Sequence, residues 1–294
     1  MNGLLVVDKA GGMTSRDVVN RVQRWFPRKT KVGHTGTLDP LATGVLVLCV
    51  GPATRLADFV QAMGKTYLAR LRLGATSTTD DADGDVTVGA NASTPTRGDI
   101  TAALAAFVGV IVQMPPAFSA LKLDGRRAYD LARRGEDVAL AARPVRVDAI
   151  RVIAYDWPFL DVEIDCGKGT YIRSIARDLG AALGCGGMVE TLRRTRVGPF
   201  TAEQGVSPDE SPEAAREKLL PMVAALDGMP RVTFDADLAR RFSDGQRMNA
   251  DDVLPAVPVG HKVAVFDSSG SLVGIAARHD DGSARPVVVF RGEM

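Results

Sequence analysis

The residues best suited to chemistry lie in one turn-rich segment, Gly33–Gly44, whose sequence is GHTGTLDPLATG. Its single carboxylate belongs to Asp39, and a carboxylate can act as a nucleophile or as a general base. Pro40 fixes its own φ and favours extended backbone at Asp39, so we expect the carboxylate on a loop outside any regular helix. The buried strand predicted over Val45–Val50 gives that loop a rigid support.

The same residues also suit a purely structural turn, in which Asp39 accepts hydrogen bonds from nearby backbone N–H groups. Most aspartates in turns have that role, so the segment taken alone favours it. The choice between the two interpretations depends on the side chains that the rest of the chain brings to Asp39.

A second candidate is Arg173, in the segment Gly167–Ser174 (GKGTYIRS). Thr170 is predicted to cap a helix, which places Tyr171 and Arg173 in its first turn. Backbone donors there favour an anion, so an arginine is unfavourable at this position unless it reaches a carboxylate or a phosphate. An ordinary surface arginine is the alternative.

Common cofactor and metal motifs do not fit. A calcium loop with Gly84 at its sixth position has Ala90 at the twelfth, where a glutamate is required. The two Gly-Lys dipeptides, at Lys65 and Lys168, lack the remaining residues of a phosphate-binding loop. The three cysteines form no C-x-x-C pair, which disfavours a disulfide scaffold or a zinc site and favours a reducing cytoplasm.

Hydrophobic periodicity predicts the elements that position these side chains. Strands are expected where apolar residues run together or alternate: Leu4–Val7, Val45–Val50, Lys65–Leu73, Val145–Tyr155, Phe159–Cys166 and Leu192–Arg196. Helices are expected in four places: from Thr14 to before Pro27, over Ala53–Ala62, over Asp99–Val108 and from Thr170 onward. A basic helix around Arg126 and Arg127 follows an extended segment, Gln113–Lys122; its alternative is a solvated surface helix.

Composition predicts a soluble protein of two unequal domains. The chain has 294 residues, of which 46% are hydrophobic and 24% charged, with no apolar run long enough to span a membrane. Residues 201–231 form a predicted connector, and short strands from Val232 onward predict a small β-barrel. Residues 1–200 have a net charge of +6 and residues 201–294 of −5, so a polyanion is expected to bind the first part.

The chain resembles bacterial tRNA pseudouridine-55 synthases, the TruB family, nearly from end to end. Five blocks show the resemblance in order: GLLVVDKAGGM at Gly3–Met13, GHTGTLDPLATG at Gly33–Gly44, Lys65–Tyr67 with Asp80–Gly84, Pro116–Lys122, and Lys168–Ser174 with Leu192–Arg194. The second block is too long for chance agreement.

The resemblance implies an α+β fold: a pseudouridine-synthase core with a bent, mixed, mostly antiparallel sheet flanked by helices. It implies a catalytic domain over residues 1–230, with an inserted RNA-binding thumb at about 113–143, and a PUA-like β-barrel over residues 231–294. The implied reaction detaches a uridine of the tRNA T-loop at its glycosidic bond, turns it and rejoins it through C5. It needs no metal, nucleotide or redox cofactor, and the expected form is a cytoplasmic monomer that binds the T-arm stem-loop.

Site residues follow from the same resemblance. Asp39 is the implied catalytic carboxylate, which attacks C1′ or removes the neighbouring 2′ proton, and Arg173 pairs with it and keeps it ionised. Tyr67 stacks on the flipped base and is placed to remove the C5 proton. The remaining expected contacts are Tyr171 and Leu192 in the base pocket, His34 in the T-loop, Asp81 near the site, and Lys9, Lys122, Arg126 and Arg127 on phosphate or sugar, with a solvated surface as the alternative for these four.

Two other functions are alternatives. A non-catalytic tRNA-binding or folding module is the first, and a lapsed enzyme is expected to have lost one of Asp39, Tyr67 and Arg173, all of which are present. An aspartyl-phosphate hydrolase built on Asp39 is the second, and it lacks a phosphate loop and a second carboxylate at motif spacing.

Overall fold

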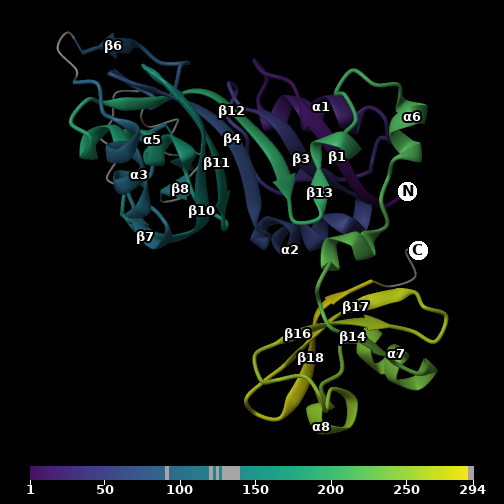
Figure 1. The fold of residues 1–294 in the computed structure, drawn as a ribbon. Helices are drawn as coiled ribbons and strands as arrows, with labels where there is room; N and C mark the ends of the chain where they lie inside the picture. Colours follow the sequence, from purple (N-terminus) through teal and green to yellow (C-terminus); the bar gives the residue numbers. More distant parts are fainter. Residues whose placement is uncertain (90–92, 119–121, 124–125, 128–139, 291–294) are drawn as a thin grey trace.

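The computed structural model describes residues 1–89, 93–118, 122–123, 126–127 and 140–290. Figure 1 shows a long, bent sheet with helices at both of its ends, and a smaller sheet beyond α2. The described residues therefore form a mixed α+β fold with helices flanking the larger sheet, as the resemblance implied.

The larger sheet has the strand order β1-β3-β12-β4-β11-β10-β7, with β2 beside β3 and β13 beside β12. Its strands are β1 Gly3–Lys9, β2 Val32–His34, β3 Thr43–Val50, β4 Lys65–Leu73, β7 Gly109–Gln113, β10 Arg143–Asp156, β11 Phe159–Cys166, β12 Gly187–Val197 and β13 Phe200–Thr201. All of its pairings are antiparallel except β12 with β3. The expected strands over Lys65–Leu73 and Phe159–Cys166 are confirmed.

The parallel pairing of β12 with β3 requires a glycine. Gly44 has φ +98°, and a Cβ built on it would lie 2.1 Å from the carbonyl oxygen of Arg194. Any larger residue would push β3 away from β12. This close approach brings Arg194 beside the start of β3, directly after the loop that holds Asp39.

The helices of this part are α1 Ser15–Gln23, η1 Gly51–Leu56, α2 Ala57–Ala62, α3 Arg97–Ala105, α5 Ile172–Ala182, η2 Ala202–Gln204, α6 Pro212–Glu217 and η3 Met222–Leu226. Thr14 caps α1 in a capping box with Asp17, as the sequence predicts. The start of α3 was placed too late, because Thr96 is its cap and Asp99 is the partner in the box. No helix in the described part of the chain is long and apolar enough to cross a membrane.

Two short hairpins lie outside the larger sheet. The first pairs β5 Ala75–Ser77 with β6 Val86–Val88, and the second pairs β8 Lys122–Leu123 with β9 Arg126–Arg127. The prediction of a helix that includes Arg126 and Arg127 is wrong, since both lie in β9. The rest of that predicted helix lies outside the described residues.

β1 and β3 are buried on both faces, which explains their continuous apolar sequences. On one face, Leu5, Leu46 and Leu48 join the main core, and on the other, Leu4 and Val47 join a second cluster. A strand that alternates between two apolar cores has no solvent side on which polar residues would be favoured.

The last part of the chain forms the second sheet, in the order β14-β16-β17-β18-β15. Its elements are β14 Arg231–Thr233, α7 Ala236–Ser243, β15 Met248–Asn249, α8 Ala250–Val253, β16 Lys262–Phe266, β17 Leu272–Arg278 and β18 Ser283–Val289. The strands that the sequence predicts over Lys262–Asp267 and Leu272–Ala277 are confirmed, whereas the third, predicted over Val287–Phe290, starts earlier, at Ser283. The sequence analysis did not predict α7 and α8. Asp235 caps α7 by accepting a hydrogen bond from the backbone N–H of Leu238.

The two sheets share one apolar cluster. Leu272, Ile275 and Phe290 pack in the same cluster as Leu56 and Val60 of η1 and α2. Two cation–π contacts, Lys262 with Phe59 at 5.1 Å and Arg55 with Phe290 at 5.8 Å, cross the same boundary. The second sheet is therefore held against the lower edge of the first part in Figure 1.

Candidate active site

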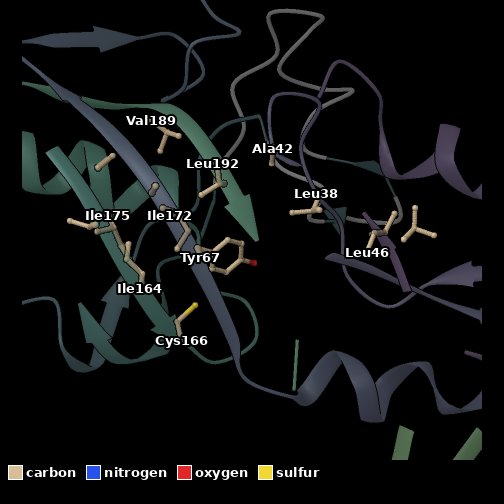
Figure 2. Packing of buried hydrophobic residues seen from close by; sticks show 14 of the residues in the cluster. Leu38, Ala42, Leu46, Tyr67, Ile164, Cys166, Ile172, Ile175, Val189 and Leu192 are labelled. Carbon is tan, nitrogen blue, oxygen red and sulfur yellow. The ribbon is translucent and has the colours of Figure 1, made fainter. Parts of the chain in front are cut away.

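A cavity of about 520 Å³ opens between the Asp39 loop, β4, β12 and the start of α5. This volume is within the roughly 300–1,000 Å³ range that is typical of small-ligand sites. Its wall includes Asp39, Tyr67, Tyr171, Arg173 and Leu192. In Figure 2 the Tyr67 ring extends from β4 with Leu192 and Leu38 among its neighbours.

Asp39 and Arg173 form an ion pair at this cavity. Arg173 Nη2 lies 2.9 Å from Asp39 Oδ2, and the exposed fractions of the side chains are 5% for Arg173 and 34% for Asp39. The guanidinium is thus buried while the carboxylate keeps an open side toward the cavity. A ligand in the cavity can reach Asp39 without breaking the pair.

Further contacts hold the Arg173 guanidinium in place. Nη1 donates to the carbonyl oxygen of Thr79 at 2.9 Å, and Nη2 donates to that of Phe118 at 2.9 Å. Asp81 Oδ2 lies 3.3 Å from Nη1 and is itself buried. Asp81 therefore lies beside Arg173, and its expected contact with substrate stays a prediction.

The Asp39 turn is built by backbone and not by its carboxylate. The N–H of Ala42 donates to the carbonyl oxygen of Asp39 at 3.1 Å, with Pro40 at the second position of the turn. The N–H of Gly12 donates to the carbonyl oxygen of Pro40 at 2.9 Å. Within the described residues, the Asp39 carboxylate accepts no hydrogen bond from its own turn. The structural-turn interpretation therefore does not account for this carboxylate.

Neighbouring side chains fix both flanks of the turn. Ser15, at the start of α1, accepts a hydrogen bond from Leu38 N–H at 2.8 Å and donates to Leu38 O at 3.1 Å. On the other flank, Asp83 Oδ2 accepts from the N–H of Leu41 at 3.1 Å. With these anchors the carboxylate is presented by a preorganised loop.

Lys9 is a third anchor and a corrected prediction. Its side chain is fully buried, and Nζ donates to the carbonyl oxygens of Ala10 at 2.8 Å, Met13 at 2.7 Å and Pro40 at 3.3 Å. Burial lowers the pKa of Lys9 to about 8. All three donors are used inside the protein, so Lys9 supports the Asp39 loop and does not contact phosphate.

Burial also sets the ionisation of Asp39. Desolvation raises the pKa of Asp39 above its ordinary value, and the nearby Asp81 carboxylate adds to the rise. The Arg173 guanidinium opposes this effect without cancelling it. Arg173 therefore favours the ionised form of Asp39, as expected, but burial and Asp81 also act on its pKa.

Tyr67 lies on β4, directly across from Arg194 on β12. Its side chain is buried, and desolvation raises the pKa of Tyr67, while a hydrogen bond with the Arg194 guanidinium and the charge of that group lower it. The resting hydroxyl is therefore protonated near neutral pH. Leu192 precedes Arg194 by two positions on the same face of β12 and packs in the main core.

Gln113 holds Tyr171 at the start of α5. Its amide accepts from the backbone N–H of Tyr171 at 2.8 Å and donates to the carbonyl oxygen of Tyr171 at 3.0 Å. Arg143 lies over the Tyr171 ring, with its guanidinium carbon 5.1 Å from the ring centre. The prediction that Thr170 caps α5 is wrong, because Tyr171 is the residue at the cap and Thr170 donates backward to Gly167 O at 3.2 Å.

One of the predicted contact residues lies away from the cavity, and three have side chains outside the described residues. His34 lies on β2, paired with Leu48, and is not part of the cavity wall. The side chains of Lys122, Arg126 and Arg127 lie outside the described part of the chain.

Sequence reasoning missed two buried cations in the cavity wall. Arg194 is 2% exposed and Lys65 is 7% exposed. Burial lowers the pKa of Lys65 to about 8, and its Nζ donates to the carbonyl oxygens of Gln61 and Met63. The resemblance assigned Leu192 to the base pocket, and strand alternation places Arg194 on the same face as Leu192, so the sequence contained this signal.

Comparisons with known proteins agree over nearly the whole chain. The family model described as TruB family pseudouridylate synthase (N terminal domain) matches residues 24–172. Two more, tRNA pseudouridylate synthase B C-terminal domain and Pseudouridine synthase II TruB, C-terminal, match residues 173–226 and 230–290.

Relatives named tRNA pseudouridine synthase B cover most of both chains. One from Burkholderia mallei is 42% identical, covering 97% of this chain and 96% of the relative, and one from Arthrobacter sp. is 44% identical, covering 99% and 97%. Among solved structures, a chain of a Cbf5-Nop10-Gar1 complex has a TM-score of 0.75 at 24% identity, covering 98% of this chain and 84% of that chain. This last likeness concerns the fold alone.

Proposed function

Because the chain belongs to the TruB family of pseudouridylate synthases, it isomerises uridine in tRNA to pseudouridine, and we propose that Asp39 starts this reaction on uridine 55 of the T-loop. The observation that most supports this role is the 2.9 Å ion pair between Arg173 and an Asp39 carboxylate that stays open to the cavity.

Asp39 acts as the ionised carboxylate. It either attacks C1′ of the flipped nucleotide or removes the 2′ proton, and both routes break the glycosidic bond and need the deprotonated group. Arg173 stabilises that form and fixes its direction, since its guanidinium is also held by Thr79 and Phe118. Asp39 is therefore directed toward the cavity before the substrate arrives.

The cavity wall receives the extruded uracil. Tyr67 and Tyr171 supply aromatic surface and Leu192 supplies aliphatic surface, which offset part of the cost of unstacking the base. Tyr67 is the group proposed to accept the C5 proton after the new carbon–carbon bond has formed. No cofactor takes part in this proposal.

RNA is proposed to lie along the first part of the chain. His34 enters the T-loop, and Lys122, Arg126 and Arg127 of the thumb at about 113–143 contact the backbone of the T-arm. The division into a catalytic domain over 1–230 and a PUA-like domain over 231–294 is supported by the two separate sheets. We place the protein in the cytoplasm as a monomer.

One assay tests the proposed substrate. A T-arm stem-loop is incubated with the purified protein, and pseudouridine is mapped by chemical modification and primer extension. Modification at uridine 55 is expected, and none in an RNA with cytidine there. Modification of other uridines with position 55 untouched would contradict the proposed target.

A further inference from the structure

Arg194 is an unusual buried charge. It is 2% exposed, lies in the cavity wall and has no ion pair with any carboxylate among the described residues. Burying a guanidinium without a counter-ion costs folding free energy. The groups around Arg194 therefore indicate what its charge is for.

Its hydrogen bonds tie two parts of the site together. Nε donates to the carbonyl oxygen of Val45 at 2.7 Å, and Nη2 donates to that of Gly36 at 3.1 Å, at the start of the Asp39 loop. The same guanidinium belongs to the cross-strand neighbour of Tyr67, and its charge and hydrogen bonding lower the pKa of the Tyr67 hydroxyl. These carbonyls fix the guanidinium but do not neutralise it, which leaves a full positive charge against one phenol.

We propose that Arg194 is a positioning residue that orients the Tyr67 hydroxyl and makes its phenolate accessible for removal of the C5 proton. This inference rests on the proposed role of Tyr67. In the step concerned, the C5–H bond breaks and its proton goes to the Tyr67 oxygen. The electron pair forms the C5–C6 double bond, and the displaced N1–C6 pair takes up a proton at N1, so the step needs no oxidant.

Burial and two neighbouring titratable groups disfavour the Tyr67 phenolate. Asp39 and Cys166, the latter on β11, both raise the pKa of Tyr67. Lys65 lies two positions before Tyr67 on β4, and its ammonium donates hydrogen bonds to backbone carbonyl oxygens. Arg194 is thus the neighbouring group that favours the ionised form of the Tyr67 hydroxyl.

The test compares Arg194→Gln with Arg193→Gln, the preceding residue on the same strand. Arg193 pairs with Asp8 at 2.8 Å, and its side chain is 40% exposed. Single-turnover release of tritium from C5 of labelled T-arm RNA is measured across pH. We expect Arg194→Gln to move the rise of the rate with pH upward by about one unit or more, with little change for Arg193→Gln.

Two further measurements distinguish an effect of Arg194 on the Tyr67 hydroxyl from a loss of structure in the variant. Arg194→Lys keeps the charge and is expected to retain a profile close to the unaltered protein. In the unaltered chain, replacing tyrosine by the more acidic 3-fluorotyrosine should move the profile downward, and it should restore part of the Arg194→Gln activity at neutral pH. An unmoved profile in the fluorotyrosine protein would overturn the inference even if Arg194→Gln fails to fold.

The Tyr67→Phe background distinguishes the inference from its premise. There, Arg194→Gln is expected to add little further loss, because the group through which it acts is gone. Equal losses in both backgrounds would overturn the inference and leave the proposed function intact. If the Tyr67→Phe protein released tritium from C5 as fast as the unaltered protein, the role proposed for Tyr67 would be refuted.

Discussion

Arg173 Nη2 lies 2.9 Å from Asp39 Oδ2, yet the pKa of Asp39 is raised. An arginine at this distance normally lowers the pKa of a carboxyl group, so desolvation at the cavity wall outweighs it. The free energy that this desolvation costs falls on one carboxylate, Asp39, whose loop is anchored on both flanks. A desolvated, ion-paired carboxylate is weakly solvated and well directed, which suits a nucleophile or base.

Replacing Asp39 by asparagine should nearly abolish pseudouridine formation. The amide keeps the size of the side chain but cannot be the ionised group, so we expect a loss of about 10²–10⁴-fold or more. Binding of tRNA should stay within a few-fold in a filter-binding assay. Asp161→Asn, on the exposed Arg70 pair, is the matched control. Normal turnover by Asp39→Asn would rule out the assigned carboxylate.

The acid side of the pH–rate profile should reflect the raised pKa of Asp39. Activity requires the deprotonated carboxylate, so the rate is expected to fall as pH decreases through a pKa above the ordinary 3.8. Removing the guanidinium in Arg173→Met should move this limb upward by about 1–3 pH units. Single-turnover rates between pH 4 and 8, roughly spanning this range, provide the measurement. A limb that does not move in Arg173→Met would mean that another group controls it.

Substitution of Lys9 should affect stability more than RNA affinity. Lys9→Met removes the ammonium donor from the carbonyl oxygens of Ala10 and Met13, while the carbonyl oxygen of Pro40 keeps the N–H of Gly12. We expect a loss of about 2–4 kcal/mol in the free energy of unfolding. Denaturant unfolding gives this value, with the exposed Lys29→Met as control. A reduced salt dependence of tRNA binding in Lys9→Met would instead indicate a phosphate contact.

The thumb arginines should account for part of the electrostatic binding. Changing Arg126 and Arg127 together to alanine is expected to weaken tRNA binding and to reduce the salt slope by about one for each phosphate that these side chains neutralise. The pair Arg240 and Arg241 on α7, both near Asp237, offers a matched control. If both double variants have the same slope as the unaltered protein, the RNA lies on another surface.

Local patterns predicted much of the fold because their causes are local. The strand over Lys65–Leu73 follows from alternation, and the cap at Thr14 follows from the spacing to Asp17. The cap of α5 could not be predicted in this way, because Gln113, far away in sequence, binds the backbone of Tyr171. Side-chain partners brought together by the sheet are absent from any local window.

The site was predicted unevenly for the same reason. Family resemblance pointed to Asp39 and Arg173, and the fold places them in contact. Lys9 was misassigned because nothing in its neighbours in sequence indicates that its ammonium is enclosed by carbonyl oxygens. Arg194 could have been found from the sequence, since it shares a strand face with Leu192, but its use of carbonyl acceptors required the structure.

The two sheets share an apolar cluster, so the boundary between the sheets is not a boundary between independently folding units. A chain that stopped near residue 230 would lack Leu272, Ile275 and Phe290, and the apolar surface left uncovered in the rest of the cluster would promote aggregation. Phe290, directly after β18, lies in this cluster and also contacts the Arg55 guanidinium of η1. Folding of the first part and folding of the second sheet are therefore coupled through this cluster, because each contributes apolar residues to it.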